Sequence, residues 1–354
     1  MSLKMISGFW VAALSFTATA SHAASSAAAV TAPEYQVTQT VALGAPDRWD
    51  YVVFDPASKR VFVAHGDEVT VVDGRKGAVV GHIKGFPGGT HGIAIVSSVG
   101  RGYTDDGEKG EAGTFDLSTL KVGKRVKAAE DADAMTFDPA SGHVFVINGD
   151  TGTITVIDPK EERAVATIPA GGKLEYAVPD GSGHLFVNGA GKKEVLSIDT
   201  RTNQVQARWP VPECTSPHGL AIDVSTHRLF VSCVNNVLTV VNTDSGAVVA
   251  KLPIGAGTDA AAFDPKRKLI FSSNGRDGTL SVIQERDPQT FVSVGTVKTA
   301  VTARTMGIDP DTGRLYLAAA DVEATPADAA PKAGGRPKVV PGSLKLLFLD
   351  PVSH

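Results

Sequence analysis

The stretch MTFDPASGHVFVI, residues 135–147, holds two apolar runs separated by the turn-forming sequence DPASG. Proline fixes φ and aspartate hydrogen-bonds the backbone ahead of it, so Asp138 and Pro139 favour a tight turn between the runs. The second run is rich in β-branched and aromatic residues, with Phe145 at its centre. The stretch therefore predicts a β-hairpin in which the aspartate serves the turn and not catalysis.

The same pattern occurs seven times along the chain. Its central aromatic residue recurs at intervals of 41 to 45 residues, as Phe62, Tyr103, Phe145, Phe186, Phe230, Phe271 and Tyr316. Third and fourth apolar runs follow the hairpins, as in TITVIDP from Thr153 and RAVATIPAGG from Arg163. A period in the low forties with strand-type alternation is typical of four-stranded propeller blades. The sequence predicts an all-β fold, a seven-bladed β-propeller of four-stranded antiparallel blades.

The seventh repeat has no fourth strand, because the chain stops soon after SLKLLFLDP at residues 343–351. A segment with the pattern of a fourth strand, YQVTQTVALG, stands instead at residues 35–44, ahead of the first hairpin. We expect this N-terminal strand to close blade seven, which removes the exposed sheet edges that favour aggregation. Residues 35–351 are thus predicted to form one propeller domain.

One repeat resembles a known family. The stretch VFVINGDTGTITVIDPKEERAVATIPAGG, residues 144–172, is similar to the repeat of the YVTN family of bacterial propellers, with FVIN at 145–148 in the place of the name motif. FSSN at 271–274, followed by GTLSVI, is a second copy, and the resemblance spans roughly residues 35–351. It implies a lactonase-like superfamily, whose relatives include lactonases that open sugar lactones and members that bind single-stranded DNA. Both enzymes and scaffold proteins have propeller folds, so the resemblance indicates the fold more strongly than the activity.

The start of the chain indicates export. Lys4, the apolar stretch at residues 5–20 and the small residues of Ser21-His22-Ala23 are typical of a secretory signal peptide over residues 1–23. A membrane anchor is the alternative, although the apolar stretch is short and ends in a cleavage sequence. Residues 24–34 are predicted to be a flexible leader, and no later segment has the roughly 18 unbroken apolar residues of a membrane span. A periplasmic or secreted protein without a span in its mature form is expected.

The charge and aromatic content of the chain disfavour one class of ligand, the nucleic acids. A formal net charge of −4, without clustered Lys and Arg, disfavours binding to a phosphate backbone. The chain has only 3 Trp, 5 Tyr and 14 Phe, which supply few platforms for base stacking. We therefore expect a small-molecule ligand or substrate and no nucleic acid.

The two cysteines fall on either side of one predicted hairpin. Cys214 precedes the first strand of blade five and Cys233 follows the second, so antiparallel pairing brings them together. In an oxidising compartment such a pair predicts a disulfide. A thiolate nucleophile and a metal site are the alternatives.

Ionisable residues occupy one level of the predicted channel. In a propeller the innermost strand of each blade lines the channel, so residues at its start gather at one mouth. Counting back from each hairpin turn places one such residue in every blade: Asp50, His91, Asp133, Glu175, His218, Asp259 and Arg304. A water-filled channel alone would favour neutral Ser, Thr, Asn and Gly. Crowded carboxylates need neighbouring cations or a metal to stay ionised, so this ring predicts a ligand-binding or active site.

The ring suits two kinds of chemistry. His91, His218, Asp133 and Asp259 form a plausible ligand set for one divalent metal ion, although no local spacing motif supports it. Without metal, His91 or His218 would act as a general base, Arg304 would hold an anion, and Asp50, Asp133, Glu175 and Asp259 would bind the ligand. No serine-hydrolase elbow, phosphate-binding loop or CxxC motif is present in the sequence.

Blade seven carries a long loop rich in Ala and Pro at residues 321–341. Since it follows the second strand, it opens on the same face as the ring, either as a tolerated insertion or as a mobile cover over the mouth.

These features favour an exported hydrolase or lyase, lactonase-like or metal-assisted, that acts on a small polar or anionic molecule at the channel mouth. The alternative is a non-catalytic periplasmic propeller that binds a ligand or metal or serves as a scaffold.

Overall fold

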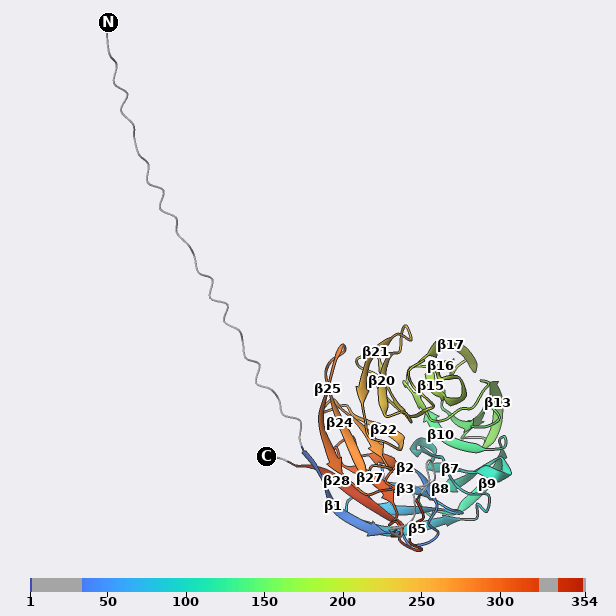
Figure 1. Ribbon diagram of the computed structural model, residues 1–354. Coiled ribbons are helices and arrows are strands. Elements are labelled where there is room, and N and C mark those ends of the chain that lie inside the picture. The colour runs from blue at the N-terminus through green and yellow to red at the C-terminus, as the bar shows by residue number, and fades with distance from the viewer. Residues whose placement is uncertain (2–33, 325–336, 353–354) are drawn as a thin grey trace. The chain divides into compact units, whose positions relative to one another are not determined.

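The computed structural model describes Met1, residues 34–324 and residues 337–352. The predicted signal peptide and nearly all of the leader lie outside the described residues, as do residues 325–336 of the loop in blade seven. The described strands belong to the compact unit that spans residues 32–354. They form seven sheets of four strands each, and Figure 1 shows the blades arranged in a ring. The predicted seven-bladed β-propeller is confirmed.

Six blades run in chain order from the innermost to the outermost strand. The first three contain β2 (Trp49–Asp55), β3 (Arg60–His65), β4 (Glu68–Asp73), β5 (Ala78–Lys84); β6 (Ile93–Val96), β7 (Arg101–Asp106), β8 (Glu111–Asp116), β9 (Val122–Lys127); and β10 (Ala132–Asp138), β11 (His143–Asn148), β12 (Thr153–Asp158), β13 (Arg163–Pro169). The next three contain β14 (Ala177–Pro179), β15 (His184–Gly189), β16 (Glu194–Asp199), β17 (Gln204–Pro210); β18 (Pro217–Asp223), β19 (Arg228–Cys233), β20 (Val237–Asn242), β21 (Val248–Pro253); and β22 (Thr258–Asp264), β23 (Leu269–Asn274), β24 (Thr279–Asp287), β25 (Thr290–Lys298). Three short 3₁₀ turns lie between strands, η1 (Ser97–Val99), η2 (Gly107–Lys109) and η3 (Ala190–Lys192).

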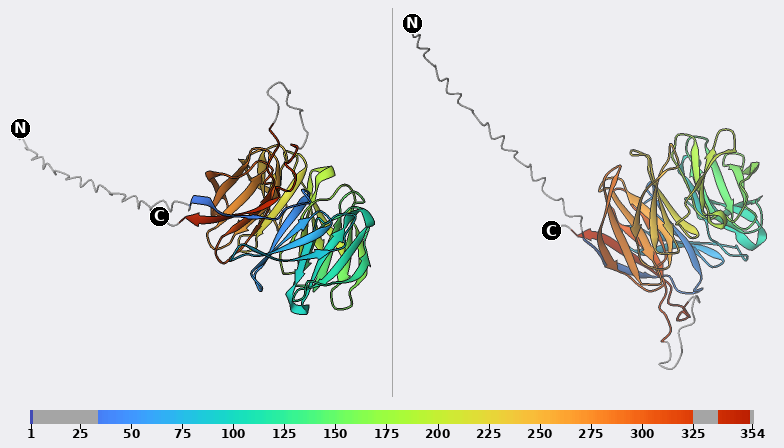
Figure 2. Two further views of the ribbon diagram at one scale, coloured as in Figure 1. Left: turned by 90° about the horizontal axis from the view of Figure 1, so that it is seen from below. Right: turned by 45° about the horizontal axis from the view of Figure 1, so that its top comes forward.

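Blade seven joins the two ends of the propeller. Its strands stand in the order β1 (Glu34–Ala42), β28 (Lys345–Val352), β27 (Leu315–Ala319) and β26 (Thr305–Ile308). Antiparallel pairing of β1 with β28 extends along both strands, which lie side by side in Figures 1 and 2. The prediction that an N-terminal strand closes blade seven is confirmed.

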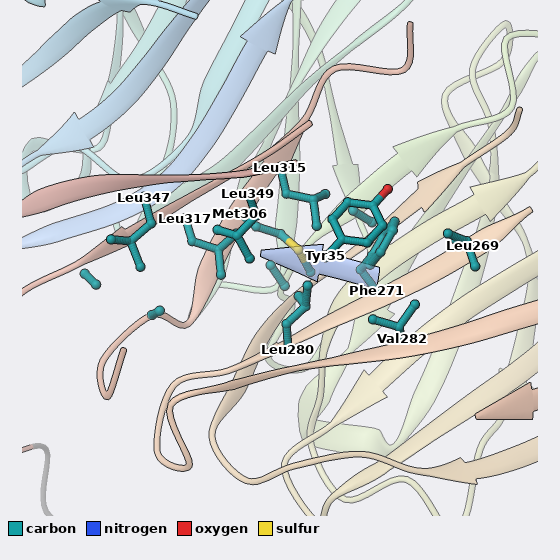
Figure 3. Close-up of a cluster of buried hydrophobic side chains, with 14 residues drawn as sticks. Tyr35, Leu269, Phe271, Leu280, Val282, Met306, Leu315, Leu317, Leu347 and Leu349 are labelled. Carbon is teal, nitrogen blue, oxygen red and sulfur yellow. The ribbon is translucent and has the colours of Figure 1, made fainter. Parts of the chain in front are cut away.

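Aromatic residues of the repeat fill the spaces between blades. All seven predicted aromatics are buried, with at most 2% of their surface exposed. Tyr35 of β1 lies against Phe271 of blade six, with ring centroids 5.0 Å apart, and Figure 3 shows the two side by side in a cluster with Met306 and Leu315. The closing strand therefore packs against the neighbouring blade as well as pairing within its own.

The repeated aspartates serve the turns, as the sequence predicts. The carboxylate of Asp138 accepts hydrogen bonds from the backbone N–H groups of Ala140 and Ser141, and Asp55 does the same for Ala57 and Ser58. Such bonds fix the hairpin and explain why the motif recurs in most blades.

A disulfide joins Cys214 and Cys233, with the two Cα atoms 5.3 Å apart. The predicted staple is thereby confirmed, and the thiolate and metal alternatives are excluded for this pair. Because Cys233 ends β19 and Cys214 lies ahead of β18, the bridge holds the entrance loop of blade five against its second strand.

The described ends of the loop in blade seven lie on the ring's face. Val322 forms a bridge with Val339, and the backbone N–H groups of Ser343 and Leu344 donate to Asp47, which precedes β2. The prediction of a mobile cover concerns residues that lie largely outside the described ones.

Deletion of residues 34–42 should expose the edge of β28 and destabilise the propeller. Buried side chains of the size of Tyr35 and Val41 each contribute about 1.5–3 kcal/mol, so a loss of at least about 3 kcal/mol, or aggregation, is expected. Thermal unfolding and sedimentation velocity measure both effects, with deletion of residues 24–33 as the control. A monodisperse truncated protein of unchanged Tm would contradict the closure mechanism.

Replacement of both cysteines by serine should lower the free energy of unfolding by about 3 kcal/mol, because the bridge closes a loop with a sequence separation of 19. Chemical denaturation compares the variant with the oxidised protein. Before reduction, thiol labelling of the native protein should detect no free cysteine; labelling of both residues would refute the bridge.

Candidate functional site

The predicted ring residues lie at the entrance of the innermost strands. β2, β10 and β22 stand near the middle of the ring in Figure 1. In four blades the pairing of the innermost strand with its neighbour shifts register, as at a β-bulge, and each shift contains a ring residue: Asp50, Asp133, His218 and Asp259. A bulge inserts an unpaired residue and redirects its side chain. The bulges thus explain how acidic and basic side chains leave the packed face of a strand at this level.

Asp259 of blade six connects two of the predicted residues. Its Oδ1 lies 2.8 Å from Nδ1 of His218, and its Oδ2 lies 2.7 Å from Nε of Arg304. Burial alone would raise the pKa of Asp259, but the hydrogen bond from His218 and the charge of Arg304 outweigh it, so the pKa is lowered. An ionised carboxylate only accepts hydrogen bonds, so Nδ1 of His218 carries a proton and Nε2 is left for other partners.

Two groups face Nε2 of His218. The hydroxyl oxygen of Ser216 lies 3.2 Å away, within hydrogen-bond distance. Oε1 of Glu175 is farther off, at 3.7 Å, and Glu175 is itself 3.7 Å from the ammonium of Lys173. The imidazole is therefore held by Asp259 on one side and is open to a hydroxyl and a carboxylate on the other.

The charge of His218 depends on these neighbours. Burial would lower the pKa of His218, but the hydrogen bond to Asp259 and the negative charges of Glu175 and Asp259 prevail, and the pKa is raised above its ordinary value of 6.5. The nearby Lys173 opposes that rise. Burial also raises the pKa of Glu175.

The side chain of Arg304 is held by several contacts. Besides Asp259, its guanidinium donates to the backbone carbonyl of Trp49 at 2.7 Å and lies over the Trp49 ring, with its central carbon 5.1 Å from the centroid. Since two of its N–H groups already have protein acceptors, Arg304 contributes a fixed positive charge more than a mobile clamp.

His91 has a different partner, which the sequence analysis missed. Its Nδ1 lies 2.7 Å from Oδ2 of Asp105, a fully buried residue whose other oxygen accepts the backbone N–H groups of His91 and Gly92. Burial raises the pKa of Asp105 to about 6. For His91, burial acts downward, but Asp105, Asp50 and Asp133 together raise the pKa to about 9.

The contact at the outer nitrogen of His91, Nε2, favours the neutral imidazole. Nε2 lies 3.0 Å from the guanidinium of Arg48, a contact that requires an unprotonated nitrogen because arginine only donates. Protonation of His91 would place two donors against each other. The carboxylates favour the imidazolium and Arg48 favours the neutral ring, so a change in the charge of His91 is linked to movement of exposed Arg48.

Carboxylates of four blades converge on Tyr51. Burial raises the pKa of its phenol well above 10, and four ring carboxylates add to the effect: Asp133, Asp50, Glu175 and Asp259. Burial likewise raises the pKa of Asp133 well above its usual range, with Asp50 contributing. The ring residues thus influence one another electrostatically, and two hydrogen-bonded groups stand among them: His218 and Arg304 with Asp259, and His91 with Asp105.

These two groups do not meet at a shared ion. Among the described residues, no set of three or more His, Cys, Asp and Glu side chains is arranged to hold a metal. His91 is paired with Asp105 and His218 with Asp259, so the predicted ligand set of His91, His218, Asp133 and Asp259 is not gathered around one point. We therefore derive no step through a metal.

Glycines beside the two histidines allow the inner strands to approach each other. A Cβ on Gly219 would lie 2.4 Å from backbone atoms of Ala260 and Ala261, and one on Gly92 would lie 2.5 Å from the carbonyl oxygen of Asp133. Because Gly219 follows His218 and Ala260 follows Asp259, this close approach brings the imidazole of one blade to the carboxylate of the next.

A separate cavity of about 290 Å³ lies toward the other end of the channel. Its walls include Val53, Ile95, Phe137 and Tyr176, and the seven ring residues are not part of its lining. The ring of Tyr176 lies 4.9 Å from that of Tyr51, centroid to centroid, so the two tyrosines stand between this cavity and the charged mouth.

The sequence analysis also missed Ser216 and Arg48. Both lie in loops just ahead of an innermost strand, two residues before the ring residues Asp50 and His218, a position that the count did not consider. The sequence did contain a weak indication of Asp105. Two consecutive aspartates end β7, whereas the matching strands of most other blades have at most one polar residue at these two positions.

Comparison with known proteins supports the propeller fold. No protein-family profile matches the chain. Curated relatives are two proteins named "Uncharacterized protein YncE", from Salmonella typhimurium and Salmonella typhi, each 27% identical over 188 residues. The match covers 51% of this chain and 52% of each relative, so the chain spans about half the length of the curated relatives it matches.

A solved structure extends the comparison to most of the propeller. Kuenenia stuttgartiensis hydrazine synthase superposes with a TM-score of 0.64 over 75% of this chain and 91% of that chain, at 17% identity. At such identity the likeness concerns the fold alone. No helix within the described residues has the length and apolar character needed to cross a membrane. The chain is a seven-bladed β-propeller of the kind that its YVTN-like repeats predict, with distant similarity to the YncE proteins.

Proposed function

We propose that the chain is an exported hydrolase that acts at the channel mouth on a small anionic ester or lactone. The observation that carries the proposal is the hydrogen-bonded pair of His218 and Asp259, with Arg304 on the second oxygen of the same carboxylate. A carboxylate that fixes the tautomer of a histidine, with the outer nitrogen directed at a hydroxyl, is the arrangement of a general base.

The chain's own residues divide the work. Asp259 orients the imidazole and stabilises its charged form, while Nε2 of His218 takes a proton from the attacking group and returns it to the leaving oxygen. Arg304 supplies fixed positive charge next to the pair, and Lys173 adds an exposed cation at the rim. These positive charges are why we favour an anionic substrate, and the ring carboxylates would accept hydrogen bonds from its hydroxyl groups.

Export is supported by two observations. The disulfide between Cys214 and Cys233 is stable in oxidising compartments, and residues 1–23 have the pattern of a signal peptide. A substrate outside the cytoplasm is therefore part of the proposal.

A non-catalytic binding or scaffold propeller is the second candidate. The observation in its favour is that Arg304, His91 and Asp105 already have protein partners, as they would in a purely structural network.

A metal-assisted reaction would require rearrangement of both histidine pairs. Dialysis against a chelator should leave activity unchanged if no metal takes part, and loss of activity with recovery on addition of one divalent ion would support the metal-assisted form.

Replacing His218 by Gln should lower hydrolysis by roughly 100- to 10,000-fold, because the general base is removed while a hydrogen-bonding side chain remains. The assay is a panel of small esters and lactones, with and without a carboxylate. His227→Gln is the matched control, since His227 also pairs with an aspartate, Asp244, at 2.8 Å but is exposed and remote from the ring in the repeat.

Arg304→Lys should lower the rate chiefly for the anionic substrates, because lysine cannot contact Asp259 and the Trp49 carbonyl with the same planar fork.

Tight retention of an anionic ligand without turnover of any ester or lactone would contradict the hydrolase and favour the binding protein. Wild-type rates in both His218→Gln and Arg304→Lys would place the reaction elsewhere.

The pH dependence has a defined sign. A base must be unprotonated to act, and the pKa of His218 is raised, so the rate should rise with pH through a midpoint above 6.5. Glu175→Gln removes one of the negative charges that raise this pKa, so the midpoint should move to lower pH. An NMR titration of the His218 ring measures it without any substrate. A midpoint at or below 6.5 in the wild type, or no shift in the variant, would contradict this electrostatic account.

A further inference from the structure

We propose that Ser216 is the nucleophile of this site and that hydrolysis passes through an acyl-enzyme. The inference rests on the proposed function, since it gives His218 an attacking group to deprotonate. It departs from the sequence analysis, in which no serine-hydrolase motif was found.

Ser216, His218 and Asp259 form a continuous hydrogen-bonded series. Oγ of Ser216 lies 3.2 Å from Nε2 of His218, and Nδ1 of the same ring lies 2.8 Å from Oδ1 of Asp259. A hydroxyl, an imidazole and a carboxylate in this order are the parts of an activated nucleophile, whatever the fold or the chain order. With Nδ1 protonated toward Asp259, Nε2 is the acceptor and the serine hydroxyl is the donor.

The loop that carries Ser216 is held at several points. The disulfide fixes Cys214, two residues upstream, to the end of β19. The side chain of Asn235 accepts the backbone N–H of Thr215 at 2.8 Å and donates to the carbonyl of Glu213 at 2.9 Å. The hydroxyl is therefore positioned by the structure around it and does not depend on the bound ligand for its placement.

The backbone of Ser216 is strained. Its φ of 46° lies in the left-handed region, which few residues other than glycine adopt, and Pro217 follows directly. Equivalent residues of other blades, among them Asp131 and Thr302, are also left-handed, so the conformation belongs to the repeat. At Ser216 it accompanies a hydroxyl that lies within hydrogen-bond distance of the imidazole.

Other serines near aspartates lack this arrangement. The hydroxyl of Ser182 donates to Asp180 at 2.6 Å, so it is engaged by a carboxylate that accepts from it without a histidine as the proton acceptor. Ser58 is engaged in the same way by Asp55. These serines belong to hairpin turns on the opposite end of the blades.

The chemistry balances without any further reactant than water. Oγ of Ser216 bonds to the carbonyl carbon of the ester or lactone while His218 takes the hydroxyl proton. The carbon–oxygen bond of the leaving alcohol breaks as His218 returns that proton to the departing oxygen; in a lactone this alcohol remains tethered to the acyl group. Water then attacks the acyl-serine, with His218 again accepting and returning one proton, and the acid and free Ser216 are released.

The test uses the mature full-length protein and a fluorophosphonate probe, which phosphonylates activated serines. We expect stoichiometric labelling, with the modified peptide containing Ser216, and loss of this label in Ser216→Ala. His218→Gln should slow labelling at least about 100-fold, because the base is missing. Ser182→Ala, the matched control, should label as the wild type does, and circular dichroism and thermal unfolding verify that all variants are folded.

The outcomes separate this inference from the function on which it rests. If folded wild-type protein carries no label at Ser216, or Ser216→Ala hydrolyses substrates at the wild-type rate while His218→Gln does not, the nucleophile inference is overturned and His218 would activate water directly. If the wild type hydrolyses nothing in the panel yet Ser216 is labelled in a His218-dependent manner, the nucleophile inference is supported and the proposed substrate class fails.

Discussion

The pairing of β1 with β28 is the constraint on which the rest of the structure depends. It joins a strand from residues 34–42 to one from residues 345–352 and so turns seven similar sheets into a closed ring. Closure fixes the spacing of the innermost strands, and the ring residues reach one another only at that spacing. The contact between His218 and Asp259 crosses from one blade to the next, and that between Arg304 and Trp49 crosses the junction between the last blade and the first. The distances between site residues of different blades are therefore fixed only when the ring is closed.

Within the closed ring, one carboxylate determines the character of the mouth. Asp259 receives Arg304 on one oxygen and His218 on the other, which keeps it ionised despite burial. The contact with Asp259, together with the charge of Glu175, stabilises positive charge on His218. Burial and crowding otherwise favour the protonated form of a carboxyl group, as the pKa of Asp133 indicates, which burial and the charge of Asp50 raise. The ring therefore contains carboxyl groups of differing acidity, and Asp259 is the one ordered as an acid–base pair with His218.

The sequence predicted the elements that repeat and missed those that occur once. Periodic aromatics specified the blades, and their register placed Asp50, His91, Asp133, His218 and Asp259 at one level. Counting could not show that Asp259 would bond His218 while His91 paired with Asp105. The first contact depends on the close approach of neighbouring backbones at Gly219, and the second on a residue of β7 that the count did not reach. Ser216 was missed for a different reason. Its left-handed backbone recurs at the equivalent residue of other blades, such as Asp131 and Thr302, but a serine beside an imidazole and a disulfide-anchored loop occur only in blade five among the described residues.

The two histidines show how equivalent positions acquire different chemistry. His91 is tied to a fully buried carboxylate of its own blade, and its outer nitrogen meets a guanidinium, which cannot accept a proton. His218 is tied to a partly exposed carboxylate of the next blade, and its outer nitrogen meets a hydroxyl, which can give one up. A proton taken up by His91 drives away Arg48, whereas a proton taken up by His218 creates an alkoxide-like oxygen beside it. The first arrangement suits control of charge at the mouth, and the second suits bond making, so chemistry at the ring is expected on the side of blades five and six.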